Sequence, residues 1–355
     1  MTDQRNILEV KDFSVNYGYG ASSVRAVTDV NFTLGASKVL GVAGESGSGK
    51  STLVYGLTRL LRAPGVISSG DVTFNILTAD GGSTPFDVLA ASEEDMRTIR
   101  WSHISIVLQS ALSALNPLRR IGREFDEVLR THDKSLSKDQ RKARSIELLS
   151  MVGLNKDRLD RFPHELSGGQ RQRVMIAMAL ALEPELVIMD EPTTALDVVT
   201  QREIVSELYE LRKKLGFAMI FITHDLSLLV ELADEIMVMY AGQIMERAVA
   251  TELYGAPRHP YTLGLMNSFP PLHGEREVLT GIPGSPPDLK ALPTGCSFNP
   301  RCPYAMDKCR EEVPPLQSIE GSSRLVACWL HDPSVSTGVP VELSKRINST
   351  EGSAK

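Results

Sequence analysis

One short stretch of the sequence has the residue types and the spacing of a phosphate-binding loop. Gly44-Glu45-Ser46-Gly47-Ser48-Gly49-Lys50-Ser51-Thr52 fits the pattern G-x-x-x-x-G-K-S/T. Glycines in such a loop let backbone N–H groups surround phosphate oxygens, and the dipole of the following helix adds positive potential. Lys50 is predicted to reach the β- and γ-phosphates of a nucleotide, and Ser51 to bind Mg²⁺. The predicted nucleotide-binding residues of the loop are Gly44, Ser46, Gly47, Ser48, Gly49, Lys50, Ser51 and Thr52.

Acidic residues follow a second apolar stretch. Leu186–Met189 has the character of a buried central strand, and it ends at Asp190 and Glu191. Asp190 is predicted to bind Mg²⁺, and Glu191 to act as the general base that polarises a water against the γ-phosphate. Asp197 follows in a turn and is predicted to contribute to the nucleotide site. The alternative is a strand whose end is simply capped by solvated acids.

Three further residues stand at the ends of expected strands. Gln109 directly follows the strand at 103–108, where it is predicted to ligate Mg²⁺ or to orient the attacking water. His224 follows the strand at 218–223, and ligands bind at such carboxyl ends in open α/β sheets, so a γ-phosphate contact is predicted. A lone histidine is otherwise usually structural. Tyr17 ends a strand ahead of the loop, where it either stacks on an adenine ring or packs at the sheet edge.

A second glycine pair precedes a helix. Ser167-Gly168-Gly169-Gln170 leads into an apolar-striped helix, and Ser167 has the chemistry of an N-cap. Bare backbone N–H groups at a helix start form an anion-binding site. An ordinary cap and turn is the alternative, and these residues alone leave it open.

The elements that position these residues can be read from the flanking sequence. Residues 38–43 are apolar enough for a buried strand, and 52–61 have apolar positions at helical spacing, which disfavours a chance lysine after an ordinary turn. Further strands are expected at 7–10, 13–17, 26–34 and 71–75, and a hairpin at 237–246. Residues 119–162 are polar and helical. Prolines cluster after about residue 255, which indicates an extended appendage with few helices.

Composition excludes several classes of protein. The 355 residues carry 38 Lys and Arg against 44 Asp and Glu, a net charge of −6, so no basic excess points to nucleic acid as a partner. The N-terminus is polar and lacks the apolar region of a signal peptide. No apolar run reaches the roughly 18 residues of a membrane span, so a cytoplasmic location is expected, with any membrane role exerted through a partner.

The four cysteines gather near the C-terminus. Cys296, Cys302, Cys309 and Cys328 do not show the short C-x-x-C spacing of common zinc sites. Disulfides are not expected in a cytosolic chain. Four thiolates here could hold an iron–sulfur cluster or a structural metal, or remain unligated. Such a metal would cross-link and stabilise a segment that does not fold stably on its own.

The order of these motifs resembles that of the ATP-binding subunits of ABC transporters. Leu166-Ser167-Gly168-Gly169-Gln170 is similar to the signature of that family, and residues 7–250 share the resemblance. The stretches Asp190–Asp197, His259–Thr262 and Gly295–Pro303 look like the oligopeptide/dipeptide importer subfamily. One departure is that Ser110-Ala111 follow Gln109, where the family commonly has Asp-Pro. Because this loop faces the membrane partner, the departure bears on the partner's identity and on the class of cargo.

The resemblance implies a fold and a division into domains. It implies an α/β P-loop (RecA-like) ABC ATPase core with an antiparallel β subdomain, a helical insertion and a small cysteine-bearing C-terminal extension. The expected limits are 1–108 and 166–250 for the core, 109–165 for the helical subdomain, 251–333 for the extension with its four-cysteine metal site, and 334–355 for a flexible tail.

The resemblance also implies a mechanism. Two ATPase subunits, identical or paralogous, pair head to tail, and each ATP lies between the phosphate loop of one and the signature of the other. Closure is passed through Gln109 and the helical insertion to two membrane permease subunits, which receive cargo from an extracytoplasmic binding protein. The chain is then peripheral at the cytoplasmic face of the cell membrane. Tyr17 takes the adenine-stacking position, and a 4Fe–4S cluster is favoured over zinc at the four cysteines.

The implied function is ATP hydrolysis that powers uptake of oligopeptides or dipeptides. Oligosaccharide uptake is an alternative, because members of the same subfamily import oligosaccharides. A soluble ABC ATPase of DNA repair or translation is an alternative from another class. Such proteins usually carry two cassettes or a long coiled-coil insertion, and this sequence shows one cassette and neither device. A regulatory iron–sulfur module whose ATPase activity is secondary is a further alternative.

Overall fold

The computed structural model describes residues 5–20, 23–78, 81–109, 114–194, 196–268, 281–319, 322–336 and 338–343. The chain divides into two compact units, each assembled from separate segments. The first unit comprises Met1–Val10, Phe32–Val39 and Asp71–Ile222, and the second comprises Lys11–Asn31, Leu40–Gly70 and Thr223–Lys355. Among the residues that the structure describes, none of the helices combines the length and the apolar character needed to cross a membrane.

The first unit contains three parallel strands. β7 (Leu186–Asp190) pairs with β6 (Ile104–Val107) on one side and with β8 (Ala218–Ile222) on the other. Every residue of β7 and β8 is buried. Continuous apolar runs are typical of parallel strands that are covered on both faces, and the sequence predicted both strands for this reason. The acidic end of β7 is therefore anchored in the best-buried part of this unit.

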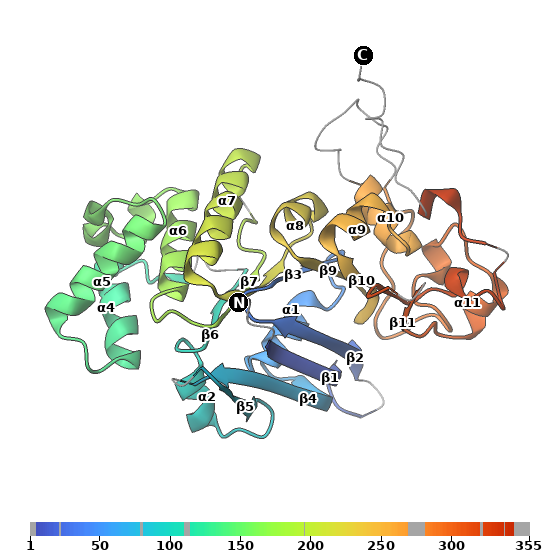
Figure 1. The fold of residues 1–355 in the computed structure, drawn as a ribbon, viewed down its shortest axis with the longest axis horizontal. Coiled ribbons are helices and arrows are strands. Elements are labelled where there is room, and N and C mark those ends of the chain that lie inside the picture. Colours follow the sequence, from blue (N-terminus) through green and yellow to red (C-terminus); the bar gives the residue numbers. More distant parts are fainter. Residues whose placement is uncertain are drawn as a thin grey trace, which may run out of the picture. The chain divides into compact units, whose positions relative to one another are not determined.

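The first unit also contains several helices. The helices at 119–162 that the sequence predicted are α4 (Ile121–His132) and α5 (Lys138–Met151), which pack against each other beside α6 (Gly168–Ala179) (Figure 1). Phe125, Leu129 and Leu149 are fully buried between them. The remaining helical elements are α2 (Glu93–Ile99), α7 (Val198–Leu215) and the 3-10 turns η2 (Lys156–Asp160) and η3 (Pro163–Glu165).

An antiparallel sheet confirms the β subdomain expected near the N-terminus. Its strand order is β2-β1-β4-β5, formed by β1 (Asn6–Tyr17), β2 (Val24–Gly35), β4 (Gly65–Leu77) and β5 (Ser83–Asp87). The sequence predicted two strands at 7–10 and 13–17, but β1 is continuous. Asp12, which lies between the two predicted strands, has φ 47°, a conformation that Asp tolerates better than most residues. Its backbone N–H and its carboxylate both bond the side chain of Asn31.

The second unit contains further paired strands. β3 (Val39–Ala43) lies parallel to β9 (Glu235–Tyr240), which forms a hairpin with β10 (Gln243–Val249) around Ala241-Gly242, as predicted. β10 pairs with β12 (Leu325–Val326), which pairs with β11 (Gln317–Ser318). Its helical elements are α1 (Lys50–Leu57), α8 (Leu226–Leu232), α9 (Ala250–Gly255), α10 (Pro260–Asn267), α11 (Asp307–Glu311), η4 (Asn299–Arg301), η5 (Trp329–His331) and η6 (Val341–Leu343).

Two local differences from the predicted elements have clear causes. The helix predicted over 52–61 ends at Leu57, because Arg59 takes φ 53°, a left-handed conformation that cannot continue a right-handed helix. The predicted flexible tail from 334 includes Leu343, which is fully buried. It belongs to a small apolar cluster of the C-terminal extension with Ile319, Val326, Cys328 and Leu330. The extension thus has an apolar core of its own.

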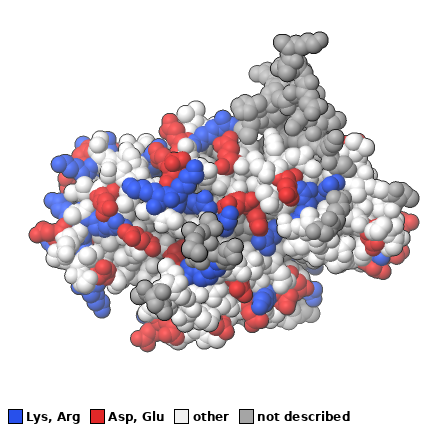
Figure 2. Space-filling model, in the orientation of Figure 1, with Lys and Arg blue, Asp and Glu red and all other residues white. Residues whose placement is uncertain are grey.

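Charged side chains of both signs are mixed on one face of the molecule. On the face that Figure 2 shows, Lys and Arg alternate with Asp and Glu rather than gathering in one broad patch. This distribution agrees with the small net charge of −6. It gives no support on that face to a nucleic-acid partner.

Candidate nucleotide-binding site

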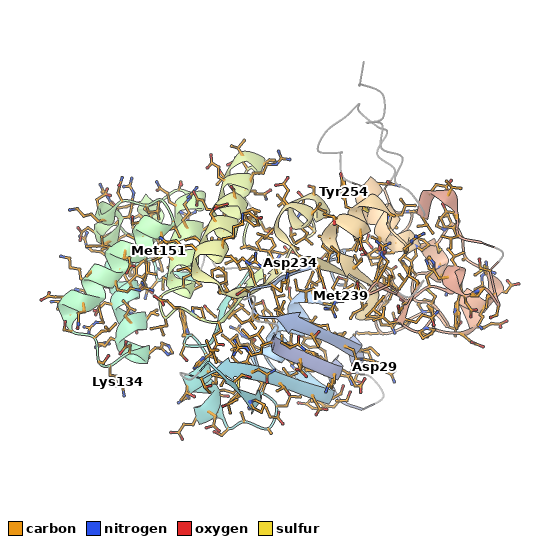
Figure 3. All side chains as sticks on the ribbon, viewed as in Figure 1. Asp29, Lys134, Met151, Asp234, Met239 and Tyr254 are labelled. Carbon is orange, nitrogen blue, oxygen red and sulfur yellow. The ribbon has the colours of Figure 1, made fainter. Side chains whose placement is uncertain are left out.

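The predicted phosphate loop connects β3 to the start of α1. The loop and α1 belong to the second unit, as does β3 apart from its first residue, Val39. Glycine is required in this loop for two different reasons, lack of space for a side chain and backbone conformation. A Cβ at Gly44 would come within 2.3 Å of the carbonyl oxygen of Met239, a residue labelled in Figure 3, and one at Gly49 within 2.5 Å of the Ala26 carbonyl oxygen. Gly47 has open space around it but φ 79°. Close backbone approach therefore fixes the ends of the loop, and conformation fixes its middle.

Lys50 is held over the loop by the loop itself. Its Nζ donates to the carbonyl oxygens of Gly44 (2.8 Å) and Glu45 (2.9 Å), with Ser48 Oγ at 3.5 Å. The Lys50 side chain is almost completely buried, while Ser46 and Gly47 are exposed. An ammonium group is thus fixed at the base of an exposed, glycine-rich turn. This arrangement suits the binding of phosphate.

Tyr17 lies at the end of β1 and reaches the first turn of α1. Its hydroxyl is 3.5 Å from Thr52 Oγ1. The contact places the ring next to the predicted phosphate loop. It is compatible with both roles that the sequence left open, adenine stacking and edge packing, so the stacking role stays a prediction.

Two predicted residues of the first unit meet at the end of β7. The Gln109 amide Nε2 donates to Glu191 Oε2 over 2.6 Å. Thr194 Oγ1 donates to the same oxygen over 3.0 Å. Glu191 has φ 47°, and its backbone N–H is bonded to the carbonyl oxygen of Ile222 (3.0 Å). Thr194 was not among the predicted site residues, and it entered the sequence argument only within the stretch Asp190–Asp197 that carries the resemblance.

The remaining predicted polar residues occupy separate positions. Asp190 is fully buried at the end of β7, next in the chain to Glu191. Asp197 caps α7 by accepting from the backbone N–H (3.0 Å) and the hydroxyl (2.8 Å) of Thr200, and these bonds lower the pKa of its carboxyl. His224 is exposed just after β8 and belongs to the second unit.

The signature stretch forms a reciprocal cap on α6. Ser167 Oγ accepts from the Gln170 backbone N–H, and Gln170 Oε1 accepts from the Ser167 backbone N–H, both at 3.2 Å. This is the ordinary capping geometry that the sequence left open as an alternative. The two glycines have a further local role. A Cβ at Gly169 would lie 2.7 Å from Thr200 Cγ2, and one at Gly168 would lie 3.1 Å from Leu196 Cδ2.

The C-terminal extension contacts the phosphate loop at Glu45. Arg301 forms two bonds with the Glu45 carboxylate, Nη1 to Oε2 at 2.6 Å and Nη2 to Oε1 at 3.0 Å. The Glu45 backbone N–H donates to the Tyr261 hydroxyl at 2.8 Å. Sequence reasoning did not connect these residues, because they are far apart in the chain. Arg301 and Tyr261 entered it only within stretches that carried the resemblance.

The four cysteines line one small pocket of the second unit. The pocket, of about 10 Å³, is otherwise lined mainly by apolar and aromatic side chains, Phe298 and Trp329 among them. None of the four cysteines, all of which are described, is in a disulfide. Burial raises the pKa of Cys296 to about 11 and that of Cys302 to about 12. These raised pKa values favour neutral thiols in the absence of a metal, and the pocket lining includes no carboxylate.

The geometry of the cysteines does not match a mononuclear ion site. Within the described ranges, no group of three or more His, Cys, Asp or Glu side chains is arranged to hold a metal ion. Structural zinc requires four ligands, with sulfur atoms about 2.3 Å from the ion. The described residues therefore contain no preformed site at the four cysteines, either for zinc or for an iron–sulfur cluster.

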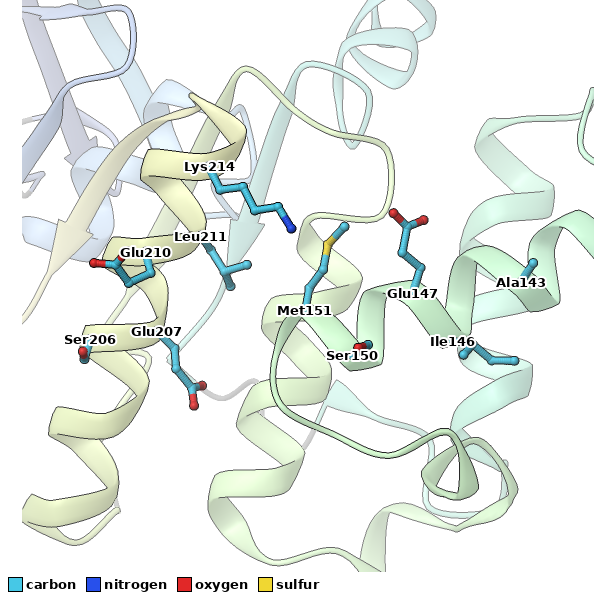
Figure 4. A pocket seen from close by; sticks show the side chains of 10 residues that line it. All are labelled: Ala143, Ile146, Glu147, Ser150, Met151, Ser206, Glu207, Glu210, Leu211 and Lys214. Atoms are coloured by element: carbon cyan, nitrogen blue, oxygen red, sulfur yellow. The ribbon is translucent and has the colours of Figure 1, made fainter.

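A groove in the first unit is separate from the predicted site. It has a volume of about 820 Å³ and lies between α5 and α7, where Figure 4 shows Lys214 and Leu211 across from Met151 and Glu147. None of the predicted site residues that the structure describes is among its lining residues. We assign it no part in nucleotide binding.

Comparison with known proteins agrees with this geometry. The family model described as "ABC transporter" matches residues 27–194, and the model "Oligopeptide/dipeptide transporter, C-terminal region" matches 245–309. The oligopeptide transport ATP-binding protein OppD of Salmonella typhimurium is 43% identical over 91% of this chain and 93% of its own length. The Bacillus subtilis OppD is 42% identical over 96% and 93%, and the dipeptide transport ATP-binding protein DppD of Haemophilus influenzae is 40% identical over 95% and 98%.

Solved structures show the same core. The ATP-binding cassette MJ0796, in a dimeric structure bound to ADP and Pi, has a TM-score of 0.58 and 26% identity, covering 68% of this chain and 98% of its own. CbiO1 from Clostridium perfringens has a TM-score of 0.58 and 30% identity, covering 70% and 90%. The fold, the phosphate loop and the capped signature define a P-loop ATPase of the ATP-binding-cassette class. The chain belongs to the family of oligopeptide/dipeptide ABC transporter ATP-binding proteins, and its activity is ATP hydrolysis coupled to transport.

Proposed function

We propose that this chain hydrolyses ATP to power the uptake of oligopeptides or dipeptides through a membrane complex. The hydrogen bonds from Gln109 and Thr194 to Glu191 carry the catalytic part of the proposal, because they orient one carboxylate at the end of a buried strand. The identity to OppD and DppD along nearly the whole chain supports the peptide cargo over oligosaccharides, and over a role in DNA repair or translation.

Each residue of the site has a proposed role. Lys50 stabilises the charge that develops on the γ-phosphate, and backbone N–H groups of the glycine-rich loop bind the phosphate oxygens. Ser51, Gln109 and Asp190 would hold Mg²⁺, which neutralises phosphate charge when bound. Glu191 accepts the proton of the attacking water, and Gln109 orients that water. Tyr17 stacks on the adenine, Asp197 supports the site from the start of α7, and His224 contacts the γ-phosphate.

A second ATPase subunit is part of this proposal. Ser167, Gly168, Gly169 and Gln170 would serve a nucleotide held by the phosphate loop of that second subunit. The support is a surface observation: Val198 and Val199, directly after Asp197, expose 66% and 68% of their surface. Exposed adjacent valines are suited to burial at a protein interface. The dimeric cassette structure of MJ0796 agrees with such pairing.

We propose that the helical insertion docks two permease subunits at the cytoplasmic face of the membrane. Leu118, which precedes α4, exposes 85% of its surface, and docking against a partner would remove this apolar side chain from water. Ser110 and Ala111, the departure from the family pattern, lie outside the described residues. An extracytoplasmic binding protein would deliver the cargo.

The four cysteines are proposed to hold a 4Fe–4S cluster. Its support is the convergence of Cys296, Cys302, Cys309 and Cys328 on one apolar pocket. We assign the cluster a structural role in the extension, and we derive no step of ATP hydrolysis from it.

The experiment that tests this function measures cargo uptake and ATP hydrolysis in the same preparation. The complex is purified with its permease and binding subunits, reconstituted in vesicles, and assayed for phosphate release and for uptake of a labelled tripeptide and a labelled trisaccharide. We expect ATP-dependent uptake of the tripeptide alone. Trisaccharide uptake would replace the peptide assignment, and phosphate release without any dependence on the membrane subunits would favour a soluble ATPase.

A further inference from the structure

Glu45 is an acidic residue inside a loop that is proposed to bind the polyanionic phosphates of ATP. A carboxylate close to phosphate oxygens repels them, and the repulsion is stronger where water screens poorly. Only a quarter of the Glu45 side chain is exposed. The two bonds from Arg301, at 2.6 and 3.0 Å, pair the carboxylate with a guanidinium in the geometry that carboxylates bind best. The pair carries no net charge beside the loop.

Arg301 is itself held in place from several sides. Its side chain is 6% exposed, and its Nε donates to the Pro283 carbonyl oxygen over 2.8 Å. Its Nη1 also donates to the Tyr240 hydroxyl over 3.3 Å. A planar guanidinium fixed in this way offers its two forward N–H groups to one carboxylate, which the ammonium group of a lysine does not do.

The backbone of Glu45 has a second anchor. Its N–H donates to the hydroxyl of Tyr261, a fully buried residue whose ring packs against Tyr240 and Phe298 with centroid distances of 4.6 and 5.3 Å. The carbonyl oxygen of Glu45 in turn accepts from Lys50 Nζ. The residue that the extension holds is therefore also a residue that holds the lysine of the loop.

We propose that Arg301 and Tyr261 are positioning residues of the phosphate loop, through which the C-terminal extension sets the affinity for ATP. Arg301 neutralises Glu45 and fixes its side chain, and Tyr261 fixes its backbone. This inference rests on the proposed function of Gly44–Thr52 as the ATP-binding loop. It assigns the extension a part in nucleotide binding that does not depend on what the four cysteines hold.

The charge argument predicts a rescue that a purely structural role does not. Arg301→Gln leaves the Glu45 carboxylate unpaired beside the phosphates, and we expect the Kd for ATP to rise about tenfold. Glu45→Gln in the same chain removes that charge, and we expect the double variant to return to within about threefold of wild type. Tyr261→Phe removes one neutral hydrogen bond, so a rise of about threefold is expected.

Arg324→Gln is the matched control, because Arg324 is another buried arginine of the extension. Arg324 is buried, donates to the Ala256 carbonyl oxygen over 2.6 Å and lies 3.9 Å from the Glu252 carboxylate, and both of these partners lie outside the loop. The measurement is equilibrium binding of a fluorescent ATP analogue to the full chain, with a thermal unfolding curve for each variant. We expect Arg324→Gln to lower the Tm but to keep wild-type affinity. If Arg301→Gln does not fold, Arg301→Lys, with about a threefold rise in Kd expected, takes its place.

Three outcomes would overturn the proposal. Arg301→Gln could bind ATP as tightly as wild type, the double variant could bind as weakly as Arg301→Gln alone, or Arg324→Gln could weaken binding equally. Lys50→Ala separates this proposal from the one on which it rests. Loss of binding in Lys50→Ala with no effect in Arg301→Gln rejects only the positioning role, whereas retained binding in Lys50→Ala rejects the ATP-binding loop itself.

Discussion

The side-chain amide of Gln109 donates a hydrogen bond of 2.6 Å to Oε2 of Glu191. The bond joins a residue after β6 to a residue after β7, and the parallel pairing of these two strands brings their carboxyl ends to one edge. Glu191 has φ 47°, a conformation uncommon in residues other than glycine. Strained backbone of this kind is typical of functional positions. The role of Glu191 as the general base stays a prediction, and the hydrogen bond from Gln109 supports it.

Removing this bond is expected to slow hydrolysis more than it weakens binding. Gln109→Ala deprives Glu191 of one hydrogen bond and the attacking water of its proposed orienting group, so kcat for ATP should fall by about 10- to 100-fold with little change in KM. Thr194→Val is the matched control, since it removes the other bond to the same oxygen without touching the water, and it should cost less. Steady-state phosphate release measures both. A wild-type kcat in Gln109→Ala would contradict the proposed role of Gln109.

Lys50 provides the test of the phosphate loop. Lys50→Ala removes the only proposed cationic side chain of the loop together with its bonds to Gly44 and Glu45. ATP affinity should fall at least about 100-fold, because one charge-assisted contact to phosphate is lost and the loop loses an internal brace. Titration with a fluorescent ATP analogue measures the loss. Glu191→Gln is the control, since it should bind ATP normally and hydrolyse none of it.

Much of the fold could be predicted because its signals are local. The apolar runs of β7 and β8, the glycine pattern of the loop and the capping residues of α6 each lie within a few neighbouring positions. The residues at the strand ends followed from them, since parallel strands place their carboxyl ends together. Gln109 and Glu191 were therefore predicted separately, and the structure brings them together.

The rest depends on contacts between distant segments. No local sequence pattern predicts the pairing of Arg301 with Glu45, because each residue alone reads as an ordinary charged residue of the surface. The strands β11 and β12 have two residues each, which is too short to show an alternating sequence pattern. They form by pairing, β12 with the edge of β10 and β11 with β12. The sequence predicted a break in β1 near Asp12. The strand instead continues through this residue, which has a left-handed backbone conformation and is hydrogen-bonded to Asn31.

The signature glycines are expected to differ in their tolerance of a methyl group. Gly169→Ala places a Cβ 2.7 Å from Thr200 Cγ2, on a β-branched side chain that cannot easily rotate away, so we expect a loss of about 1–3 kcal/mol in the free energy of unfolding. Gly168→Ala meets only the flexible end of Leu196 at 3.1 Å and should be nearly neutral. Urea denaturation of both variants measures the difference.

A compensating change identifies the clash as the cause. Thr200→Ser removes Cγ2 but keeps the hydroxyl that bonds Asp197. In the Gly169→Ala chain it should recover most of the lost stability. If the stability of the double variant equals that of Gly169→Ala, the loss has another origin.

The cysteine pocket leads to a prediction about metal content. Protein purified without oxygen should contain about four iron atoms and four sulfides per chain, and Cys302→Ser should lower the iron content and the Tm together. Ser297→Ala is a nearby control, because Ser297 is buried beside the pocket cysteine Cys296 and is not a ligand candidate. Elemental and sulfide analysis with thermal unfolding measures both. Stoichiometric zinc, or no metal with an unchanged Tm in Cys302→Ser, would reject the cluster.

Tyr17 distinguishes adenine stacking from edge packing. Tyr17→Phe keeps the ring and removes only the contact with Thr52 Oγ1, which at 3.5 Å is long for a hydrogen bond between hydroxyls. Its ATP affinity should match that of wild type. Tyr17→Ala removes the ring, and stacking of a base on an aromatic side chain is worth about 1–3 kcal/mol, so affinity should fall by about 5- to 150-fold.

Inorganic triphosphate supplies the internal comparison, because it lacks the adenine. Its binding should be equal in wild type, Tyr17→Phe and Tyr17→Ala if Tyr17 acts on the base. Edge packing predicts a different pattern, in which Tyr17→Ala disturbs the start of α1 through Thr52 and weakens ATP and triphosphate alike. Competition of each compound against a fluorescent ATP analogue gives both affinities. Parallel losses for the two compounds would therefore assign Tyr17 to the packing of the sheet edge.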